Sequence, residues 1–383
     1  MTDDPPNFAL LPAGLMDLLP PEAEHEAALV EVMMAAFARQ GYERVKPPLL
    51  EFEESLLAGS GAAVAEQTFR LMDPVSQRMM GLRADTTPQV ARIAATRLAG
   101  VARPLRLCYA GQVLRVRGQA LAPERQLPQT GIELIGSTSA EADAEVATVA
   151  VEALAAAGVA DVSLDITLPT MTGTLFEAAG IAGEARQRLA RALDRKDFAA
   201  VTERVRATGA ALRALPALLA AAGPADGALA ALEDADLPEA ARAIALNAAA
   251  VVDAIRARAP GLRLTLDPVE FRGFRYHTGV AFTIFGAGRV GELARGGRYV
   301  SLNEEHATGM SLYPDAVLRA APRMAPPSRV FLAIGTPAAV GQALRAQGYA
   351  TIAALEARDT AATLRCTHVI RDGAAVALNE KKV

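Results

Sequence analysis

Hydrophobic positions near the start of the chain recur with the spacing of a helix. Five apolar residues follow one another at alternating intervals of three positions and one position: Leu29, Val32, Met33, Ala36 and Phe37. This period predicts an amphipathic helix over about residues 22–40, which Gly41 ends.

A short strand is predicted directly after this helix, from Tyr42 to the pair Pro47 and Pro48. Proline has no N–H to donate to a neighbouring strand, so this segment does not fit the middle of a sheet. We therefore expect it at the edge of a sheet or at an interface.

Apolar and polar residues alternate in two segments, 105–118 and 129–136, which flank the polar stretch 119–128. This pattern predicts two antiparallel strands joined by a long loop, and loops of this length are usually functional. Thr138 and Glu141 then form a capping box, which predicts the start of the next helix.

Residues 168–259 are rich in Ala, Leu and Arg with helical periodicity, interrupted at Gly223-Pro224 and near Pro238. This composition predicts an all-helical insertion. Strand patterns return in LRLTLDPVEFRG, YHTGVAFTIF and GRVGEL. The predicted fold class is α+β, with an antiparallel sheet that is flanked by helices and split by the insertion.

A proline-rich linker, residues 322–328, separates the core at 1–321 from a small C-terminal α/β domain at 329–383. Within this domain, a hairpin is predicted at Asp372-Gly373, because this dipeptide favours a tight turn between strands. A unit of about 55 residues is marginal on its own, so we expect it to pack on something.

Composition narrows the class of protein. Of the 383 residues, 51% are hydrophobic and 21% are charged, as in an ordinary globular protein. The longest stretch without a formal charge covers the 15 residues 330–344, which is too short to cross a membrane. The start of the chain lacks the pattern of a secretion signal, and Cys108 and Cys366 fit neither a disulfide framework nor a metal site. We therefore expect a cytoplasmic protein without a membrane segment.

Nucleic acid is disfavoured as a partner. The net charge is −4, aromatic residues make up 4% of the chain, and Trp is absent. Binding to nucleic acid needs clustered cations and often stacking rings. The sequence also lacks the phosphate-binding, zinc-protease, nucleophile-elbow and dinucleotide motifs, so no cofactor or metal is predicted.

Polar side chains converge on one predicted strand pair. Gln129 and Glu133 face the same side of their strand, because side chains alternate with a period of two, and Arg115 lies on the neighbouring strand. An Arg, an amide and a carboxylate on one sheet face would suit a ligand with both an amine and a carboxylate. The alternative is a solvated face crossed by ordinary ion pairs.

Two further segments carry candidate residues. Arg272, Arg275 and His277 lie between glycines at the start of a strand, where glycine allows close approach to a ligand. The alternative is a bulged strand with exposed cations. Asp85 precedes a helix, together with Thr86 and Thr87, and either contributes to a site or caps that helix.

Taken in order, six segments resemble histidyl-tRNA synthetase and its paralogue, the regulatory subunit of ATP phosphoribosyltransferase. The segments are LLPAGLMDLLP, GYERVKPPLLEFEE, GLRADTTPQVAR, LCYAGQVLRVRG with RQLPQTGIELIG, RGFRYHTG and GGRY, and they span about residues 8–320. The resemblance implies a class II aminoacyl-tRNA synthetase-like core. It also implies a dimer that forms through the first helix and the proline-ended strand.

Departures from the synthetase pattern concern ATP. The synthetase binds phosphates with an Arg and the nucleotide with a Glu two positions later, whereas here Arg115 is followed by Arg117. The segment that carries the synthetase's γ-phosphate Arg reads here Tyr313, Pro314, Asp315 and Ala316. Losing such a cation removes several kcal/mol of transition-state stabilisation. We therefore expect the chain not to activate histidine.

The synthetase's amino acid pocket is better preserved. Asp85 stands where the synthetase has a Glu for the substrate amine, and Arg275 and His277 replace an Asp and a Tyr. The resemblance implies a histidine-like pocket made of Asp85, Thr86, Thr87, Arg115, Gln129, Glu133, Arg272, Tyr276 and His277. The substitutions predict weaker binding or a changed ligand.

The resemblance as a whole implies a non-catalytic regulatory subunit. It would join a short-form ATP phosphoribosyltransferase catalytic chain in the first step of L-histidine biosynthesis and help transmit feedback inhibition by histidine. The catalytic residues would then lie in the partner, and no tRNA would be bound. Two alternatives stay open: an active synthetase-like ligase, and a free-standing histidine sensor.

Overall fold

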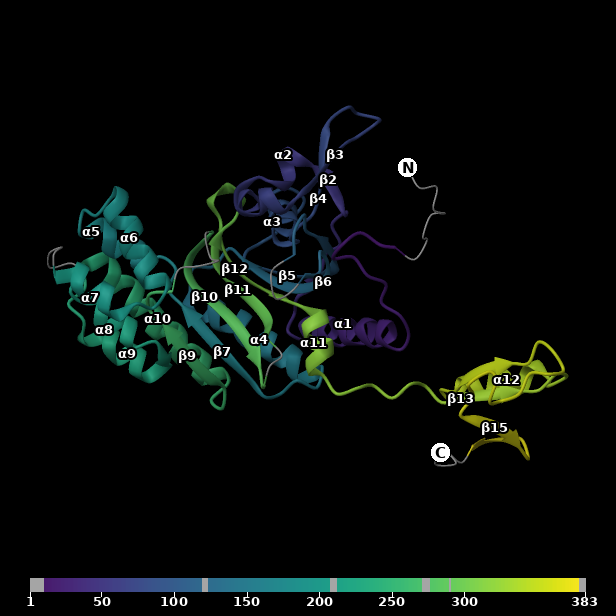
Figure 1. Ribbon diagram of the computed structural model, residues 1–383. Helices are drawn as coiled ribbons and strands as arrows, with labels where there is room; N and C mark the ends of the chain where they lie inside the picture. The colour runs from purple at the N-terminus through teal and green to yellow at the C-terminus, as the bar shows by residue number, and fades with distance from the viewer. Residues whose placement is uncertain (1–9, 119–122, 207–211, 271–275, 289–290, 379–383) are drawn as a thin grey trace, which may run out of the picture. The chain divides into compact units, whose positions relative to one another are not determined.

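The computed structural model describes residues 10–118, 123–206, 212–270, 276–288 and 291–378. The chain divides into two compact units, Met1–Pro322 and Arg323–Val383. The first unit holds a large sheet with its helices, and the second holds a small sheet with one helix (Figure 1).

A nine-stranded sheet forms the centre of the first unit, in the order β1-β5-β6-β12-β11-β10-β7-β9-β8. The strands are, in that order, Glu43–Arg44, Leu105–Leu114, Gln126–Ile135, His306–Leu312, Glu292–Val300, His277–Gly286, Val162–Thr167, Arg263–Asp267 and Gly223–Pro224. The α+β class is confirmed. Two neighbouring pairs, β1 with β5 and β7 with β9, are parallel where an antiparallel sheet was expected. Parallel neighbours need a crossover connection, and the helical insertion supplies it between β7 and β9.

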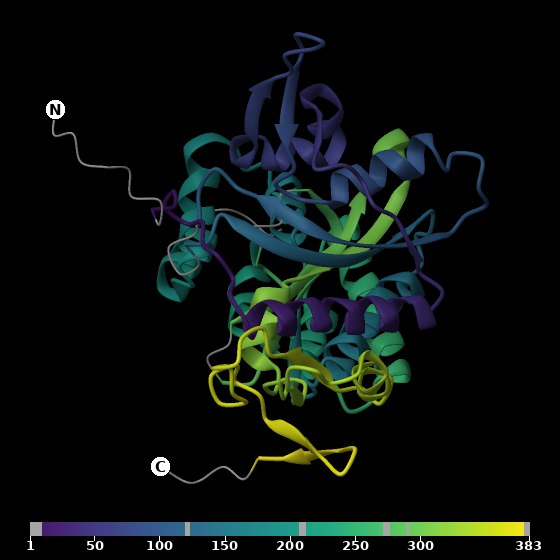
Figure 2. The same ribbon diagram turned by 90° about the vertical axis from the view of Figure 1, so that its right-hand side faces the viewer.

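The first predicted helix and the strand after it are confirmed. Helix α1 covers Glu22–Arg39 and buries Leu29, Met33 and Phe37. Strand β1 ends before Pro47-Pro48 and is the edge strand of the sheet. Figure 2 shows α1 running along one side of the sheet at the surface of the unit.

Two long helices, α4 at Ala140–Ala156 and α10 at Glu239–Arg258, form the main core with one face of the sheet. The predicted capping box at the start of α4 was wrong by one residue. Ser139 is the N-cap, and its Oγ accepts a hydrogen bond from the N–H of Ala142. Both Thr138 and Ser139 have a capping hydroxyl, but the extended backbone of Ser139 directly precedes the helix.

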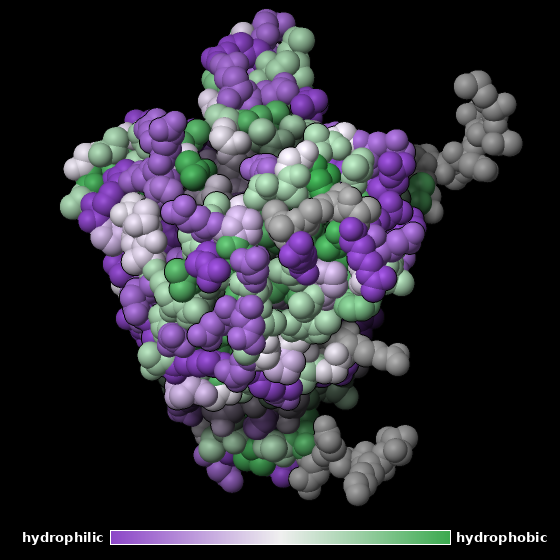
Figure 3. All heavy atoms as spheres, turned by 90° about the vertical axis from the view of Figure 1, so that its left-hand side faces the viewer, coloured by the Kyte–Doolittle hydropathy of each residue, from purple (hydrophilic) through white to green (hydrophobic). Residues whose placement is uncertain are grey.

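In the described residues of the insertion between β7 and β9, the regular elements are helices, with the two-residue strand β8 as the exception to the predicted all-helical composition. Besides α10 the insertion contains α5, α6, α7, α8 and α9, at Met171–Ala178, Gly183–Asp194, Phe198–Arg206, Leu215–Ala220 and Ala225–Asp234. Figure 3 views the molecule from the side of the insertion, where hydrophilic and weakly hydrophobic side chains mix over the surface. This view shows no broad apolar patch on that side.

A three-stranded sheet projects from the first unit (Figures 1 and 2). Its order is β2-β4-β3, at Leu50–Phe52, Met79–Leu82 and Phe69–Met72, and the short helices α2 at Glu53–Leu56 and η1 at Gly59–Gln67 accompany it. Helix α3 at Thr87–Thr96 follows β4 and packs on β5 and β6, on the face away from α4. A short 3-10 turn, η3 at Leu302–Glu304, connects β11 to β12, and α11 at Pro314–Ala320 follows β12.

The second unit is a four-stranded sheet in the order β14-β13-β15-β16. The strands are Ala350–Ala353, Arg329–Leu332, His368–Arg371 and Ala374–Ala377, and α12 covers Ala338–Ala346. The predicted hairpin is confirmed, because β15 and β16 pair antiparallel around Asp372 and Gly373, which have φ of 49° and 80°. Among the described residues of the whole chain, no helix is both long and apolar enough to cross a membrane.

Candidate functional site

Several predicted pocket residues lie on the face of the nine-stranded sheet opposite α4 and α10. Residues that pair in register point to the same side of a sheet. One row across β5, β6, β12 and β11 consists of Tyr109, Gly131, Ser311 and Arg295. In the next row, Glu133 lies opposite Gly309. We call this side of the sheet the pocket face.

Gln129 fixes the loop that precedes α3. Its Oε1 accepts the N–H of Thr86 at 3.0 Å, and its Nε2 donates to Asp85 Oδ1 at 3.0 Å and to Ser311 Oγ at 2.9 Å. Asp85 Oδ1 also accepts the N–H of Thr87 at 3.0 Å. Asp85 therefore accepts a hydrogen bond from the first turn of the helix, whose N-cap residue is Thr86, and also joins the polar cluster, while its role in a site stays a prediction.

Glu133 is the most deeply buried acid of the cluster, with 1% of its surface exposed. Thr87 Oγ1 donates to Oε1 at 2.8 Å and the hydroxyl of Tyr299 donates to Oε2 at 2.9 Å. Burial raises the pKa of Glu133 to about 8, although these two hydrogen bonds oppose the shift. No cation within the described part of the chain forms an ion pair with Glu133. The carboxyl group is thus held by two neutral hydroxyl donors in the described structure.

Glycines on neighbouring strands make room for these polar side chains. A Cβ atom on Gly309 would lie 1.9 Å from Glu133 Oε2, and one on Gly131 would lie 2.4 Å from the hydroxyl of Tyr109. That hydroxyl forms hydrogen bonds with Ser311 Oγ at 2.8 Å and Thr87 Oγ1 at 3.3 Å. Any larger residue at either glycine would displace the network.

A small cavity opens beside Glu133. Its volume is about 10 Å³, which is room for about one water molecule, and its lining includes Thr87, Glu133, Tyr276, His277 and Tyr299. The rings of Tyr276 and His277 stack with their centroids 4.2 Å apart. Burial, with a contribution from the Arg295 charge, lowers the pKa of His277 to about 3. The imidazole of His277 is therefore neutral at pH 7.

Arg115 lies at the end of β5, apart from the hydrogen-bonded cluster. Its Nε points to the carbonyl oxygen of Ala84 at 3.5 Å, and Arg117 nearby is exposed. Burial raises the pKa values of Tyr313 and Glu292, and the Arg115 charge partly offsets both shifts. The positive charge of Arg115 thus acts on Tyr313 and Glu292, while its side chain contacts the carbonyl oxygen of Ala84.

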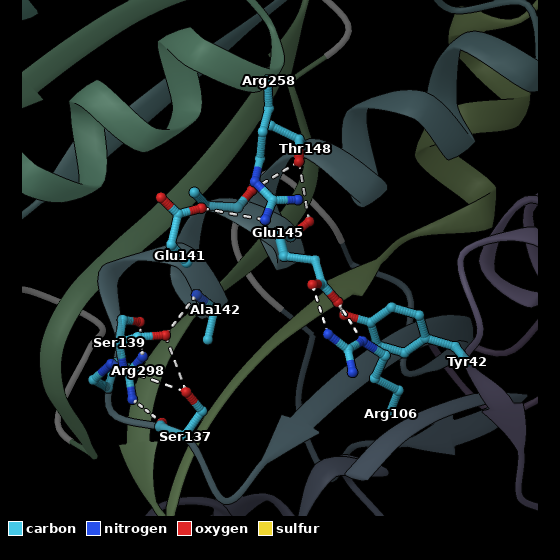
Figure 4. A network of polar contacts seen from close by, with 11 residues as sticks. Tyr42, Arg106, Ser137, Ser139, Glu141, Ala142, Glu145, Thr148, Arg258 and Arg298 are labelled. Carbon is cyan, nitrogen blue, oxygen red and sulfur yellow. Dashed lines mark hydrogen bonds and ion pairs between the residues drawn. The ribbon is translucent and has the colours of Figure 1, made fainter. Parts of the chain in front are cut away.

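The strand that carries Tyr299 is anchored to α4 from the opposite face. Arg298 forms a buried ion pair with Asp143 at 2.9 Å and donates to the carbonyl oxygens of Ser137 and Ser139. Figure 4 shows Arg298 beside the start of α4 and, one turn further along the helix, Glu145 meeting Tyr42 and Arg106. These contacts fix the spacing between α4 and the strands that bear the site.

The described residues contain no group of three or more His, Cys, Asp or Glu side chains that could hold a metal ion.

The sequence of the histidyl-tRNA synthetase family matches residues 14–317. The ATP phosphoribosyltransferase regulatory subunit of Paramagnetospirillum magneticum is 57% identical over 350 residues, which cover 91% of this chain and 92% of that protein. The chain belongs to this family of regulatory subunits.

Solved structures of the family share the fold. An ATP phosphoribosyltransferase regulatory subunit/histidyl-tRNA synthetase from Bacillus halodurans matches with a TM-score of 0.80 and 25% identity, over 94% of this chain and 97% of that chain. A chain of the ATP phosphoribosyl transferase (HisG:HisZ) complex from Thermotoga maritima matches with a TM-score of 0.59 and 18% identity, over 76% of this chain and 97% of that chain.

The structure brings together five of the residues that the sequence predicted for the regulatory subunit's pocket: Asp85, Thr86, Thr87, Gln129 and Glu133. Tyr276 and His277 line the cavity beside them. Arg115 contacts the loop at Ala84 instead of the cluster. Arg272 and Arg275 lie outside the described residues.

Three residues of the network were missed at the sequence level: Tyr109, Tyr299 and Ser311. Alternation along ARGGRY would have placed Arg295, Gly297 and Tyr299 on one face, so a signal for Tyr299 was present. For Ser311 no local signal exists, because its neighbours depend on the pairing of β6 with β12, which are far apart in the sequence.

Proposed function

We propose that the chain acts as the regulatory subunit of an ATP phosphoribosyltransferase, in complex with a short catalytic chain, and that the pocket beside Glu133 binds histidine as the feedback signal. The 57% identity to a regulatory subunit over nine-tenths of the chain supports the first part. The buried acid Glu133, which has no ion pair among the described residues, supports the second, because an ammonium group would stabilise its charged form.

The cluster suits the amine end of a zwitterion. Glu133 supplies a carboxyl group, and Asp85, which Gln129 holds in place, supplies a second one in the same hydrogen-bonded cluster. The cavity as it stands has room for one water molecule. Histidine can therefore bind only after the side chains around the cavity, which include Tyr276 and His277, have moved apart.

Synthetase activity of the chain itself is expected to be absent. Where a transferring phosphate would need cations, the charge of Arg115 already acts on Tyr313 and Glu292. Asp315 forms an ion pair with Arg319 at 3.2 Å, one helical turn further on. Purified protein with ATP, histidine and labelled pyrophosphate should show no exchange above background, and exchange at the rate of a synthetase would favour the ligase alternative.

A dimer through α1 and β1 is the expected form of the chain. Strand β1 is the sheet edge, with Glu43 and Arg44 both exposed, and α1 exposes 38% of Val32. Replacing Val32 with Glu should shift the sedimentation of the protein toward the monomer. A Val75→Glu variant, which changes an exposed residue in the β3–β4 turn, should sediment as the parent does.

We expect the protein to be cytoplasmic and to bind no tRNA. The histidine pocket and the partner must be coupled, and such coupling is reciprocal. Histidine should therefore change the affinity of the chain for the catalytic subunit by the same factor as the catalytic subunit changes its affinity for histidine. A protein that binds histidine but forms no complex with the catalytic chain would instead be a free-standing sensor.

A further inference from the structure

The pocket face continues beyond the histidine-like pocket toward the insertion. Register pairing extends the row that contains Arg295 through Thr283 on β10 and Asp165 on β7 to Thr265 on β9. Strands lie about 4.8 Å apart, so Asp165 is about 10 Å from the position of Arg295. Figure 1 shows β7 and β9 between β10 and the helices of the insertion.

Asp165 lies half-buried on this stretch of the sheet. It makes no hydrogen bond or ion pair within the described part of the chain, whereas nearby Asp267 is paired with Lys196. Burial, and then the charge of Asp267, raise the pKa of Asp165. Among the described residues, Lys196 pairs with Asp267 and leaves Asp165 without a cation.

Two threonine hydroxyls beside Asp165 are also without partners. Thr167 lies two residues further along β7 on the same face, 7% of its surface is exposed, and its buried Oγ1 has no hydrogen-bond partner in the described structure. The buried Oγ1 of Thr265, which is opposite Asp165 in register, also has no hydrogen-bond partner in the described structure. Buried hydroxyl groups are normally hydrogen-bonded. The two unpaired hydroxyl groups therefore suggest that a ligand supplies their hydrogen-bond partner.

We propose that Asp165, Thr167 and Thr265 form a second subsite on the pocket face, which binds an organic cation of the ammonium or guanidinium type. An ammonium group has three N–H donors, and one carboxylate with two hydroxyls offers acceptors for all three. A divalent metal is a poor match, because calcium takes six or more oxygen ligands and the site holds one unpaired carboxylate.

The cation comes either from a free metabolite or from a Lys or Arg side chain of the catalytic subunit. Agmatine, which carries both cationic groups, is the probe for the free ligand, with uncharged butylurea as its control. In calorimetry, agmatine should bind the full chain and Asp165→Asn should weaken it at least about tenfold, since a charged hydrogen bond is lost. Thr167→Val, which keeps the side-chain volume, should weaken it about threefold. Asp161→Asn is the matched control, because this exposed acid at the start of β7 pairs with Arg263.

The second arm measures the affinity of each variant for the catalytic chain, and only this arm depends on the proposed function. One outcome assigns the cation to the partner. In that case agmatine binds weakly or not at all, D165N weakens the complex with the catalytic chain at least tenfold, and D161N leaves the complex unchanged. If D165N changes neither agmatine binding nor complex formation relative to D161N, the subsite does not exist. D165N should fold, because it removes a charge that burial disfavours.

Discussion

Replacing Glu133 with Gln tests whether this buried carboxyl group receives the ammonium group of the ligand. The substitution keeps the shape of the side chain and removes its ionisable proton. With a pKa of about 8, about one empty pocket in ten holds the carboxylate at pH 7. Forming that carboxylate at pH 7 costs about 1.4 kcal/mol.

The sign of the pH effect follows from this proton. Below pH 8 the empty pocket holds a proton on Glu133, and an ammonium ion must displace it. Histidine binding should therefore strengthen about fivefold from pH 7 to pH 8 and level off at higher pH. E133Q should bind about ten- to a hundredfold more weakly at pH 8, because a hydrogen bond to a charged group contributes about 1.5–3 kcal/mol.

Calorimetry in two buffers of different ionisation enthalpy counts the protons released. The imidazole of free histidine contributes the same proton exchange to both titrations. Beyond this contribution, the parent protein should release about 0.9 proton per bound histidine at pH 7, and E133Q should release none. Glu184→Gln, at an exposed acid of the insertion, should behave as the parent. A parent protein whose binding releases no such proton and is independent of pH would refute the assignment of Glu133.

Three further predictions concern the support of the site. Gly309→Ala should abolish histidine binding, because the new Cβ would overlap the Glu133 carboxyl group, and should lower the free energy of unfolding by about 1–3 kcal/mol in urea titrations. Unchanged binding would show that the carboxyl group has room to move. Since folding raises the pKa of Glu133 from 4.5 to about 8, the parent should lose about 2.7 kcal/mol of stability relative to E133Q between pH 6 and pH 9, and parallel stability curves would contradict this. Arg298→Met should cost about 3–5 kcal/mol by leaving Asp143 buried and unpaired, and adding Asp143→Asn should recover most of that loss; an equally unstable double variant would assign the cost to packing.

Local patterns predicted the elements that depend on local physics. Helix α1 and the Asp372-Gly373 hairpin are fixed by residues within a few positions of one another, so hydrophobic period and turn chemistry are sufficient. The start of α4 was misplaced by one residue, because Thr138 and Ser139 offer the same hydroxyl and only the backbone conformation chooses between them. The parallel pairing of β7 with β9 depends on the whole insertion between them, which no local pattern encodes.

In the site, too, local patterns predicted positions within one strand but not the contacts between strands. Gln129 and Glu133 could be assigned to one face from their spacing along a single strand. The partners that define their chemistry come from elsewhere: Ser311 and Gly309 from β12, and Tyr299 from β11. Their positions depend on the register between strands more than 150 residues apart in the sequence, as between Glu133 and Tyr299. Arg115 was expected beside Gln129 because it follows the adjoining strand, but the register pairs Gln129 with Gly111, so Arg115 lies four residues further along the chain.

The central claim is that this chain regulates a partner instead of catalysing a reaction of its own. The most direct test mixes the purified full-length chain with a purified short catalytic subunit and measures phosphoribosyl-ATP formation with and without histidine. The account predicts a rate well above that of the catalytic subunit alone, and inhibition by histidine that E133Q weakens. A catalytic rate that the chain leaves unchanged, while the chain alone exchanges pyrophosphate with ATP in the presence of histidine, would contradict it.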